Sequence, residues 1–187
     1  MEQVFIHHKP NALSKTACKK IIHFFDSNPS LHLPGALGPK GTIDKTKIQS
    51  TEINLNLSTN SDIGFLKEAA GNLMGEYRRL FPLIDTHLDQ WYLQPSCQLM
   101  KYEAGEAYRR IHCERGSGGG LHRLLGWMIH LNTVKKGGET VFVYQKLKIK
   151  PKIGGAYIWP ADWTHMHYGE TAHNETKYII TGWYDYM

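Results

Sequence analysis

The chain has 187 residues, of which 41% are hydrophobic and 21% are charged, and this balance is ordinary for a single soluble globular domain. No apolar run approaches the roughly 20 residues that cross a bilayer, and the first residues lack the basic and then apolar pattern of a signal peptide. Three scattered cysteines are too few for a disulfide framework, which favours a reducing, cytoplasmic location. Lys and Arg outnumber Asp and Glu by 22 to 17. This excess favours contact with polyanions without establishing it, so we expect a modestly basic soluble protein.

The first part of the chain predicts a helix and then a long loop. Apolar residues recur at helical spacing between Leu13 and Phe25, and the polar run 26–29 ends the helix with a proline. Residues 28–47 are rich in proline and glycine, so they predict a loop. A loop of this length is often functional, for instance as a lid over a binding site.

A strand and a second helix follow the loop. Residues 51–57 alternate between apolar and polar side chains, which predicts a half-buried strand. Its predicted buried side chains are Ile53, Leu55 and Leu57, and its predicted exposed ones are Glu52, Asn54 and Asn56. Asn60 or Ser61 can cap the second helix. The apolar face of this helix runs from Leu66 to Leu80, and a proline two residues later ends it.

From Trp91 onward the sequence is typical of a β-rich region. Short strand-like runs are separated by glycine-bearing turns, which predicts an antiparallel sandwich or barrel. The predicted strands are 98–102, 124–131, 140–144, 147–150, 156–159 and 178–184. We therefore expect one mainly β domain with N-terminal helices, in which the helical part covers about residues 1–90 and the β core about residues 91–187.

Three pairs in which a histidine precedes an acidic residue by two positions are candidates for a metal site. They are His87 with Asp89, His112 with Glu114, and His173 with Glu175. On a strand, residues two apart point to the same face, so such a pair can offer both side chains to one ion. Two histidines and one carboxylate on a single face are the ligands of mononuclear iron oxygenases. With 11 histidines and 17 acidic residues, about one such pair arises by chance, so the pattern needs further context.

The context favours the pair at His112. The pairs at His87 and His173 lie in polar connectors, where solvated loop histidines are the simpler interpretation. His112, which we expect on a strand, stands within an ordered series of motifs. The series comprises residues 98–102, Gly105, Tyr108, Arg123, Leu131, Asn132, 137–140, 150–155, 158–160, His167 and 177–183. From about residue 98 to residue 183, nearly half of the chain, it resembles the prolyl 4-hydroxylase-like branch of the 2-oxoglutarate (2OG) and iron(II)-dependent oxygenases.

The resemblance implies a double-stranded β-helix core, which is a jelly roll of the cupin type, with the helices outside one sheet. It also implies an iron(II) site made of His112, Glu114 and His167. The family's basic residue follows the distal histidine by about ten positions, as Lys177 follows His167. His165 stays the alternative, because both histidines would point the same way on an extended segment. The family usually has aspartate at the position of Glu114.

The cofactors that the resemblance implies are Fe(II), 2OG and O2, with ascorbate as an optional addition. Lys177 matches the residue that binds the far carboxylate of 2OG, and Tyr102 and Trp183 match aromatic residues that line the same pocket. His130 stands where the family often has a phenol that reaches this carboxylate. Without the resemblance, Lys177 would be taken as a solvated strand lysine and the two aromatics as core residues.

The implied activity is hydroxylation of an unactivated carbon, with decarboxylation of 2OG to succinate. A peptidyl proline in a peptide or protein is the favoured substrate, and Tyr108 and Arg110 are candidates for contacting it. The alternatives are a small-molecule oxygenase, a nucleic-acid oxygenase on the same fold, and a non-catalytic cupin-like protein that binds a metal or ligand. The basic balance favours the nucleic-acid alternative, and the lack of a basic arm interleaved with aromatic residues argues against it. The sequence does not indicate an oligomeric state.

Two further patterns have simple interpretations. The glycine-rich run 116–120 lacks the Gly-Lys-Ser/Thr of a phosphate cradle, so we expect a loop beside the metal. Lysines alternate with apolar residues between Lys146 and Lys152, which predicts the solvent-facing side of a strand.

Overall fold

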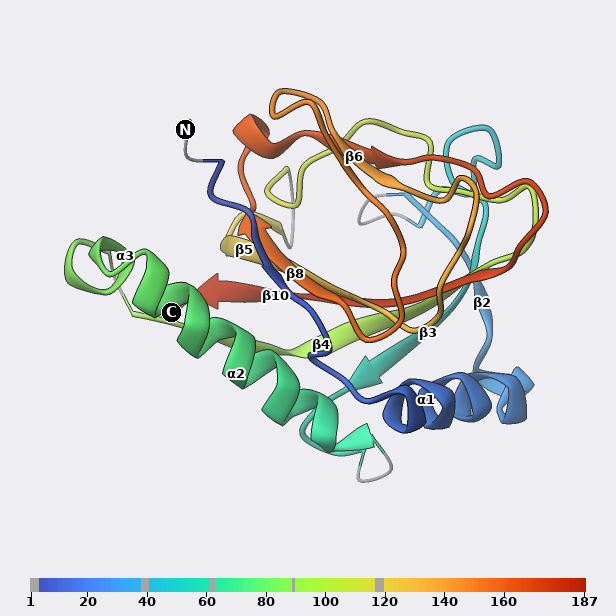
Figure 1. Ribbon diagram of the computed structural model, residues 1–187, viewed down its shortest axis with the longest axis horizontal. Coiled ribbons are helices and arrows are strands. Elements are labelled where there is room, and N and C mark those ends of the chain that lie inside the picture. Colours follow the sequence, from blue (N-terminus) through green and yellow to red (C-terminus); the bar gives the residue numbers. More distant parts are fainter. Residues whose placement is uncertain (1–3, 38–40, 61–62, 89, 117–119) are drawn as a thin grey trace.

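The computed structural model describes residues 4–37, 41–60, 63–88, 90–116 and 120–187. Within these residues the chain forms two facing β-sheets, with helices packed against the outer face of the larger one (Figure 1). This confirms the predicted double-stranded β-helix with N-terminal helices. None of the described helices is long and apolar enough to cross a membrane.

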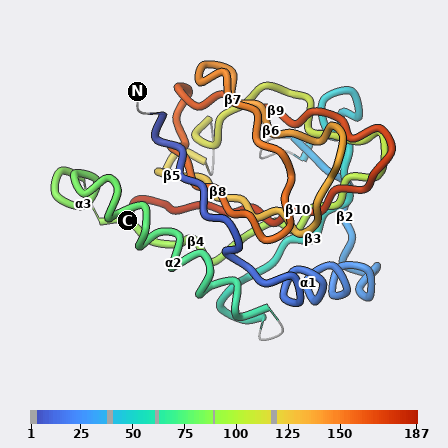
Figure 2. The backbone as a smooth tube through the Cα atoms, in the orientation of Figure 1, coloured from blue at the N-terminus to red at the C-terminus, as the bar shows by residue number. Residues whose placement is uncertain are grey.

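The larger sheet has seven antiparallel strands in the order β1-β8-β5-β10-β4-β3-β2. Their bounds are β1 His7–Lys9, β2 Leu33–Pro34, β3 Thr51–Asn56, β4 Trp91–Tyr102, β5 Arg123–His130, β8 Ala156–Pro160 and β10 Lys177–Tyr186. The last strand of the chain, β10, lies between β5 and β4. The first strand, β1, runs along β8 before the chain enters its first helix (Figure 2).

The smaller sheet of the described structure has three strands in the order β7-β6-β9. Their bounds are β6 Thr140–Phe142, β7 Leu147–Ile149 and β9 His167–Gly169. An isolated bridge between His112 and His167 adds a further element at the β9 edge. The strand predicted at His112 is therefore reduced to this single bridge, because the chain bends at Glu114.

The central strand β5 of the larger sheet is buried on both faces, since its side chains point alternately to the helix side and to the smaller sheet. On β5, Leu125, Trp127 and Ile129 belong to the hydrophobic cluster that also contains the buried residues of the helices. Met128 points the other way and belongs to a second cluster between the sheets, together with Phe142. The candidate metal ligands border this second cluster, so the fold places them between the two sheets.

Helix α1 (Lys15–Ser27) begins at Ser14, whose hydroxyl accepts a hydrogen bond from the Ala17 N–H at 3.1 Å. Its buried residues recur every three or four positions and face the sheet. They are Cys18, Ile21 and Phe25. Each large apolar side chain that is fully buried stabilises the fold by about 1.5–3 kcal/mol, so this face anchors the helix.

Helix α2 (Phe65–Leu80) begins later than predicted. Its N-cap is Gly64, which makes no side-chain cap bond, whereas the sequence predicts a cap at Asn60 or Ser61. Asn60 belongs to the connection after β3, where its N–H donates to the backbone, and Ser61 lies outside the described residues. The helix ends before Pro82 as predicted, and a short helix α3 (Leu83–Thr86) follows.

The polar side of β3 is not uniformly exposed. Asn54 and Asn56 are exposed as predicted, but Glu52 is only 7% exposed. The reason is that β2 pairs with β3 at this residue, and that the Glu52 carboxylate accepts a hydrogen bond from the Ser50 hydroxyl at 2.7 Å. Burial raises the pKa of Glu52, against the lowering effect of this hydrogen bond.

The predicted loop 28–47 contains ordered pieces. A 3-10 turn, η1 (Pro29–Leu31), and strand β2 lie within it, and Leu37 is buried in the cluster between the sheets. Residues 38–40 lie outside the described part. A role as a lid stays a prediction, and Ala36 of this segment does line the cavity that is described below.

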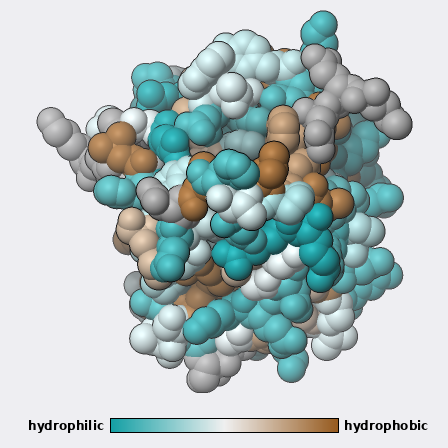
Figure 3. All heavy atoms as spheres, turned by 90° about the vertical axis from the view of Figure 1, so that its left-hand side faces the viewer, coloured by the Kyte–Doolittle hydropathy of each residue, from teal (hydrophilic) through white to brown (hydrophobic). Residues whose placement is uncertain are grey.

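The remaining predictions concern the surface and the cysteines. Strand β7 lies where a strand with alternating lysines is predicted, and Lys146, Lys148, Lys150 and Lys152 are exposed. Cys18, Cys97 and Cys113 are free. The face shown in Figure 3 is mostly polar, with separate hydrophobic patches. Residues 1–90 supply β1 to β3 as well as α1 and α2, so they share one hydrophobic core with the rest of the chain.

Candidate metal centre

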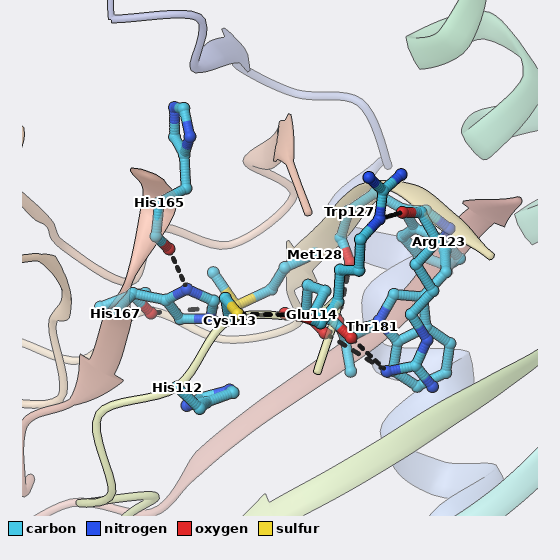
Figure 4. A network of polar contacts seen from close by, with 12 residues as sticks. His112, Cys113, Glu114, Arg123, Trp127, Met128, His165, His167 and Thr181 are labelled. Carbon is cyan, nitrogen blue, oxygen red and sulfur yellow. Dashed lines mark hydrogen bonds and ion pairs between the residues drawn. The ribbon is translucent and has the colours of Figure 1, made fainter. Parts of the chain in front are cut away.

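Three side chains that are predicted to bind a metal converge between the two sheets (Figure 4). One ligand atom from each of His112, Glu114 and His167 lies within 4.8 Å of the other two. No other His, Cys, Asp or Glu side chains form such a group of three in the described part of the chain. His87 follows α3 and belongs to no such group, and His173 lines a separate cavity of about 610 Å³. Asp89 lies outside the described residues.

The backbone brings the two candidate histidine ligands together. The His112 N–H donates to the His167 carbonyl at 3.0 Å, and the His167 N–H donates to the His112 carbonyl at 2.8 Å. This reciprocal pair is the hydrogen-bonded form of an antiparallel bridge. It holds the two imidazole rings at a centroid distance of 4.4 Å.

Hydrogen bonds to the outer ring nitrogens orient both imidazoles. The His112 Nδ1–H donates to the Arg110 carbonyl at 3.0 Å, and the His167 Nδ1–H donates to the His165 carbonyl at 2.9 Å. Each bond assigns the proton to Nδ1 and leaves the Nε2 lone pair for a metal. The Nε2 of His167 lies 3.4 Å from Oε1 of Glu114.

The protonation states of the cluster also suit a metal. Burial lowers the pKa of His112 to about 4, and the neighbouring His167 acts in the same direction. Burial acts to raise the pKa of Glu114, but the contacts with His167, His112 and Trp183 hold this pKa at about 2. At neutral pH the site therefore offers a neutral imidazole and an ionised carboxylate. Two imidazoles and a carboxylate on one side of an open cavity fit the ligand set of Fe(II).

His165, the alternative distal ligand, is used differently. Its ring points away from the cluster in Figure 4, and its Nε2–H donates to the Val4 carbonyl at 3.0 Å. Its Nδ1 pairs with the Thr164 hydroxyl at 3.0 Å. Because both ring nitrogens are engaged elsewhere, His165 supports His167 through its carbonyl group only.

A cavity of about 570 Å³ runs past the three ligands. It is bordered by the inner face of β10, with Lys177 toward one end and Trp183 toward the other. At about 3.3 Å per strand residue, these two side chains are some 20 Å apart along β10. The volume lies within the range of about 300–1,000 Å³ that is usual for small-molecule sites.

Lys177 is a buried cation at the far end of this cavity and is 4% exposed. Its ammonium donates to the Gly138 carbonyl at 3.2 Å and lies 4.6 Å from the ring centroid of Tyr102, its neighbour in the β10–β4 register. It makes no ion pair with any described residue. Burial lowers the pKa of Lys177 to about 8, although Glu139 acts to raise it. A buried charge without a counterion is costly, so this end of the cavity suits an anion such as the far carboxylate of 2OG.

His130 and Trp183, which the resemblance places at the 2OG pocket, differ in their relation to this cavity. His130 is fully buried and is not among the residues that line the cavity. Burial, with the nearby Lys177, lowers the pKa of His130 to about 3, so its ring is neutral. Trp183 lines the cavity, but its indole contacts Glu114 and not Lys177.

The two candidate substrate residues both line the cavity. The Tyr108 ring stacks on the His112 ring at a centroid distance of 4.1 Å, and Arg110 is exposed. Gln94 lines the cavity too and was missed by the sequence, which predicts a strand only from residue 98. Strand β4 begins at Trp91, seven residues before the predicted start. Pro95 lies where the register between β4 and β10 shifts, and a strand tolerates proline at such an irregularity.

The comparisons with known proteins agree with this site. The model of the 2OG-Fe(II) oxygenase superfamily matches residues 97–185. No curated protein matched the sequence significantly. Solved structures with the same fold include the viral collagen prolyl hydroxylase of Paramecium Bursaria Chlorella virus-1 in complex with 2OG, with a TM-score of 0.72 and 16% identity over 98% of this chain and 97% of that one.

Two further solved structures are similar. A Pseudomonas putida prolyl-4-hydroxylase has a TM-score of 0.72 and 12% identity over 99% of this chain and 94% of that one. A Trichoplax adhaerens prolyl hydroxylase in complex with a hypoxia inducible factor peptide fragment has a TM-score of 0.78 and 15% identity over 98% of this chain and 84% of that one. At these identities the structures establish a shared fold.

The family match extends from within β4 to within β10 and contains His112, Glu114, His167 and Lys177. The converging donor set and the unpaired buried cation are what Fe(II) and 2OG require. Over these residues the chain is therefore similar to the 2OG-Fe(II) oxygenase superfamily, and its site is that of a dioxygenase that uses Fe(II), 2OG and O2.

Proposed function

We propose that this dioxygenase hydroxylates a proline within a peptide or protein, with His112, Glu114 and His167 as its iron ligands. The observation that carries the oxygenase chemistry is the buried, unpaired ammonium of Lys177 in the same cavity as the three ligands. The choice of substrate is supported by the shared fold, since the similar structures are prolyl hydroxylases and one of them holds a peptide.

The residues of the chain have separate tasks in this reaction. His112, Glu114 and His167 would hold Fe(II) beside the cavity that they line. When bound, Fe(II) and 2OG supply the oxidising chemistry, in which one oxygen atom of O2 enters succinate, the other enters the substrate C–H bond, and CO2 leaves. Lys177 would pair with the far carboxylate of 2OG as a compact charge. Phe142 and Trp159 pack around the His167 ring at centroid distances of 5.0 and 5.4 Å and keep water from that side.

The lining of the cavity suits an amide backbone. Gln94 and Gln98 belong to it, and each side chain can both donate and accept a hydrogen bond. Oε1 of Gln94 is buried and lacks a partner among the described residues, so it can accept from a peptide N–H. Arg110 lines the same cavity and is exposed, so it can contact a peptide carbonyl.

A peptide array tests the proposal. The protein is incubated with proline-containing peptides, Fe(II), 2OG and O2, and we expect a mass gain of one oxygen on a proline, together with an equal amount of succinate. A His167→Ala protein serves as the control and should give neither product. Succinate formation without peptide oxidation, but with oxidation of a small metabolite or a methylated oligonucleotide, would replace proline by one of those substrates.

A further inference from the structure

The two carboxylate oxygens of Glu114 have different neighbours. Oε1 faces Nε2 of His167 at 3.4 Å, inside the ligand cluster. Oε2 accepts a hydrogen bond from the indole N–H of Trp183 at 2.6 Å. A short hydrogen bond to an ionised oxygen is among the stronger orienting contacts in proteins, so Trp183 determines which oxygen faces the metal position.

Arg123 holds the indole ring and the ligand segment in place. Its guanidinium lies 3.6 Å from the centroid of a Trp183 ring, and its Nη1 lies 3.8 Å from Oε2 of Glu114. The same Nη1 donates to the backbone carbonyl of Glu114 at 3.2 Å. The cation therefore links the ring, the carboxylate and the backbone of the ligand.

Gly126 supplies the space that the glutamate occupies. It lies directly opposite Trp183 in the register of β5 and β10. A Cβ atom on Gly126 would lie 2.9 Å from Cγ of Glu114 and 3.0 Å from the Trp159 ring. Glycine inside a strand is unfavourable relative to alanine, and the packing of Glu114 against this position accounts for the glycine here.

We propose that Trp183, Arg123 and Gly126 form a socket that is specific for a glutamate ligand, in which Trp183 is a positioning residue that holds Oε2 and leaves Oε1 for the metal. The extra methylene of glutamate extends the carboxylate by about 1.5 Å relative to aspartate. An aspartate at position 114 would therefore fall short of the indole. This inference rests on the metal centre of the proposed function.

A second trio with the same chemistry serves as an internal control. Trp91 donates its indole N–H to Oδ1 of Asp85 at 3.1 Å, and Arg78 lies 4.3 Å from the Trp91 ring centroid. Arg78 Nε also lies 3.1 Å from the same Asp85 oxygen. Neither Asp85 nor Trp91 lines the cavity, so this trio has no part in metal binding.

The main experiment compares Trp183→Phe with Trp91→Phe in the full chain. Each substitution keeps an aromatic ring beside an arginine and removes one indole N–H from a carboxylate. Co(II) and Fe(II) are titrated anaerobically, and the ligand-field spectrum of bound Co(II) reports its coordination. We expect Trp183→Phe to weaken metal binding by about 10- to 100-fold, as is usual for residues that orient a ligand, and to change the Co(II) spectrum. Trp91→Phe should leave both unchanged.

A double-mutant cycle then tests the specificity for glutamate. In a Glu114→Asp background the carboxylate no longer reaches the indole, so adding Trp183→Phe should alter metal affinity by less than about twofold, the usual error of additivity. An equal loss in both backgrounds would assign Trp183 a general packing role and overturn the proposal.

The outcomes separate the socket from the metal centre itself. If His167→Ala binds Co(II) as well as the unaltered protein does, the ligand assignment fails and the socket with it. If His167→Ala loses the metal but Trp183→Phe keeps the unaltered affinity and spectrum, only the socket is wrong. Thermal unfolding of the metal-free variants identifies a folding defect. If Trp183→Phe is unstable, Trp183→His replaces it in the test. This variant retains a ring N–H and should keep part of the metal affinity.

Discussion

The two ends of the cavity differ in how their polar groups are satisfied. At the metal end, each candidate ligand already has a partner in the protein. His112 and His167 donate from Nδ1 to backbone carbonyls, and Glu114 accepts from Trp183. At the other end, Lys177 has one carbonyl partner and no counterion among the described residues, and both ring nitrogens of His130 are buried there without a partner.

This difference indicates that the two ends bind their ligands for different reasons. The metal end is pre-organised, so metal affinity depends on the geometry of side chains that are already oriented. The other end carries the buried charge of Lys177, and in the proposed function the far carboxylate of 2OG compensates its cost. Substitutions at the metal end should therefore change geometry, whereas substitutions at the other end should change charge and stability.

The largest expected effect is the loss of a ligand at the metal end. His167→Ala should lower Fe(II) affinity by more than about 100-fold. Replacing a residue that only orients a ligand already lowers metal affinity by about 10- to 100-fold, and loss of the ligand itself should cost more. Anaerobic Fe(II) titration with 2OG, followed through the visible charge-transfer band, measures this loss. His165→Ala keeps the carbonyl that orients His167 and should retain most of the affinity. The reverse pattern would make His165 the ligand.

The next largest effect is expected at the charged end. Lys177→Ala should raise the dissociation constant of 2OG by about 30-fold or more, since truncating one partner of a buried charge pair costs about 2–5 kcal/mol. Metal affinity should not change, because Lys177 makes no contact with the three ligands. Lys148→Ala is the matched control, as this lysine is exposed and pairs with Glu170 at 2.7 Å. Equal 2OG affinity in all three proteins would make Lys177 a structural lysine.

The pH dependence of 2OG binding distinguishes charge from geometry. The pKa of Lys177 is lowered to about 8, so the ammonium is present below this pH and is lost above it in the free protein. The 2OG dissociation constant should be constant below pH 8 and should rise about tenfold per pH unit above it. Isothermal titration at several pH values measures this slope. Lys177→Arg keeps its charge throughout and should bind with little pH dependence, whereas a slope retained in this variant would point to another group.

The smallest effect is expected for His130. His130→Phe removes two unpartnered buried nitrogens, so the metal-free protein should gain about 1 kcal/mol in its free energy of unfolding. Chemical denaturation measures this gain. Because His130 does not line the cavity, 2OG affinity should stay within about twofold of the unaltered value. A clear loss of 2OG affinity would instead return His130 to the role that the family resemblance implies.

Much of the site could be predicted because it follows from order and spacing along the chain. The pair His112 and Glu114 and the interval between His167 and Lys177 are short-range patterns, and the short strand-like runs at β5 and β10 predict strands. The burial of Glu52 was missed, because it depends on pairing with β2, which is too short to leave a pattern. The late start of α2 was missed because its cap, Gly64, offers no side chain.

Sequence alone therefore determined the fold class through periodicity within each segment, and its resemblance to a known family, through the order of motifs along the chain, indicated the candidate ligands and Lys177. Tertiary structure alone decided which histidine near residue 165 faces the cluster, that Trp183 contacts Glu114 and not Lys177, and that Gly126 leaves room for this ligand. The physical reason is that these contacts join β5, β10 and the segment after His112 across the sheet. Cross-strand register, which no local pattern encodes, selects such neighbours.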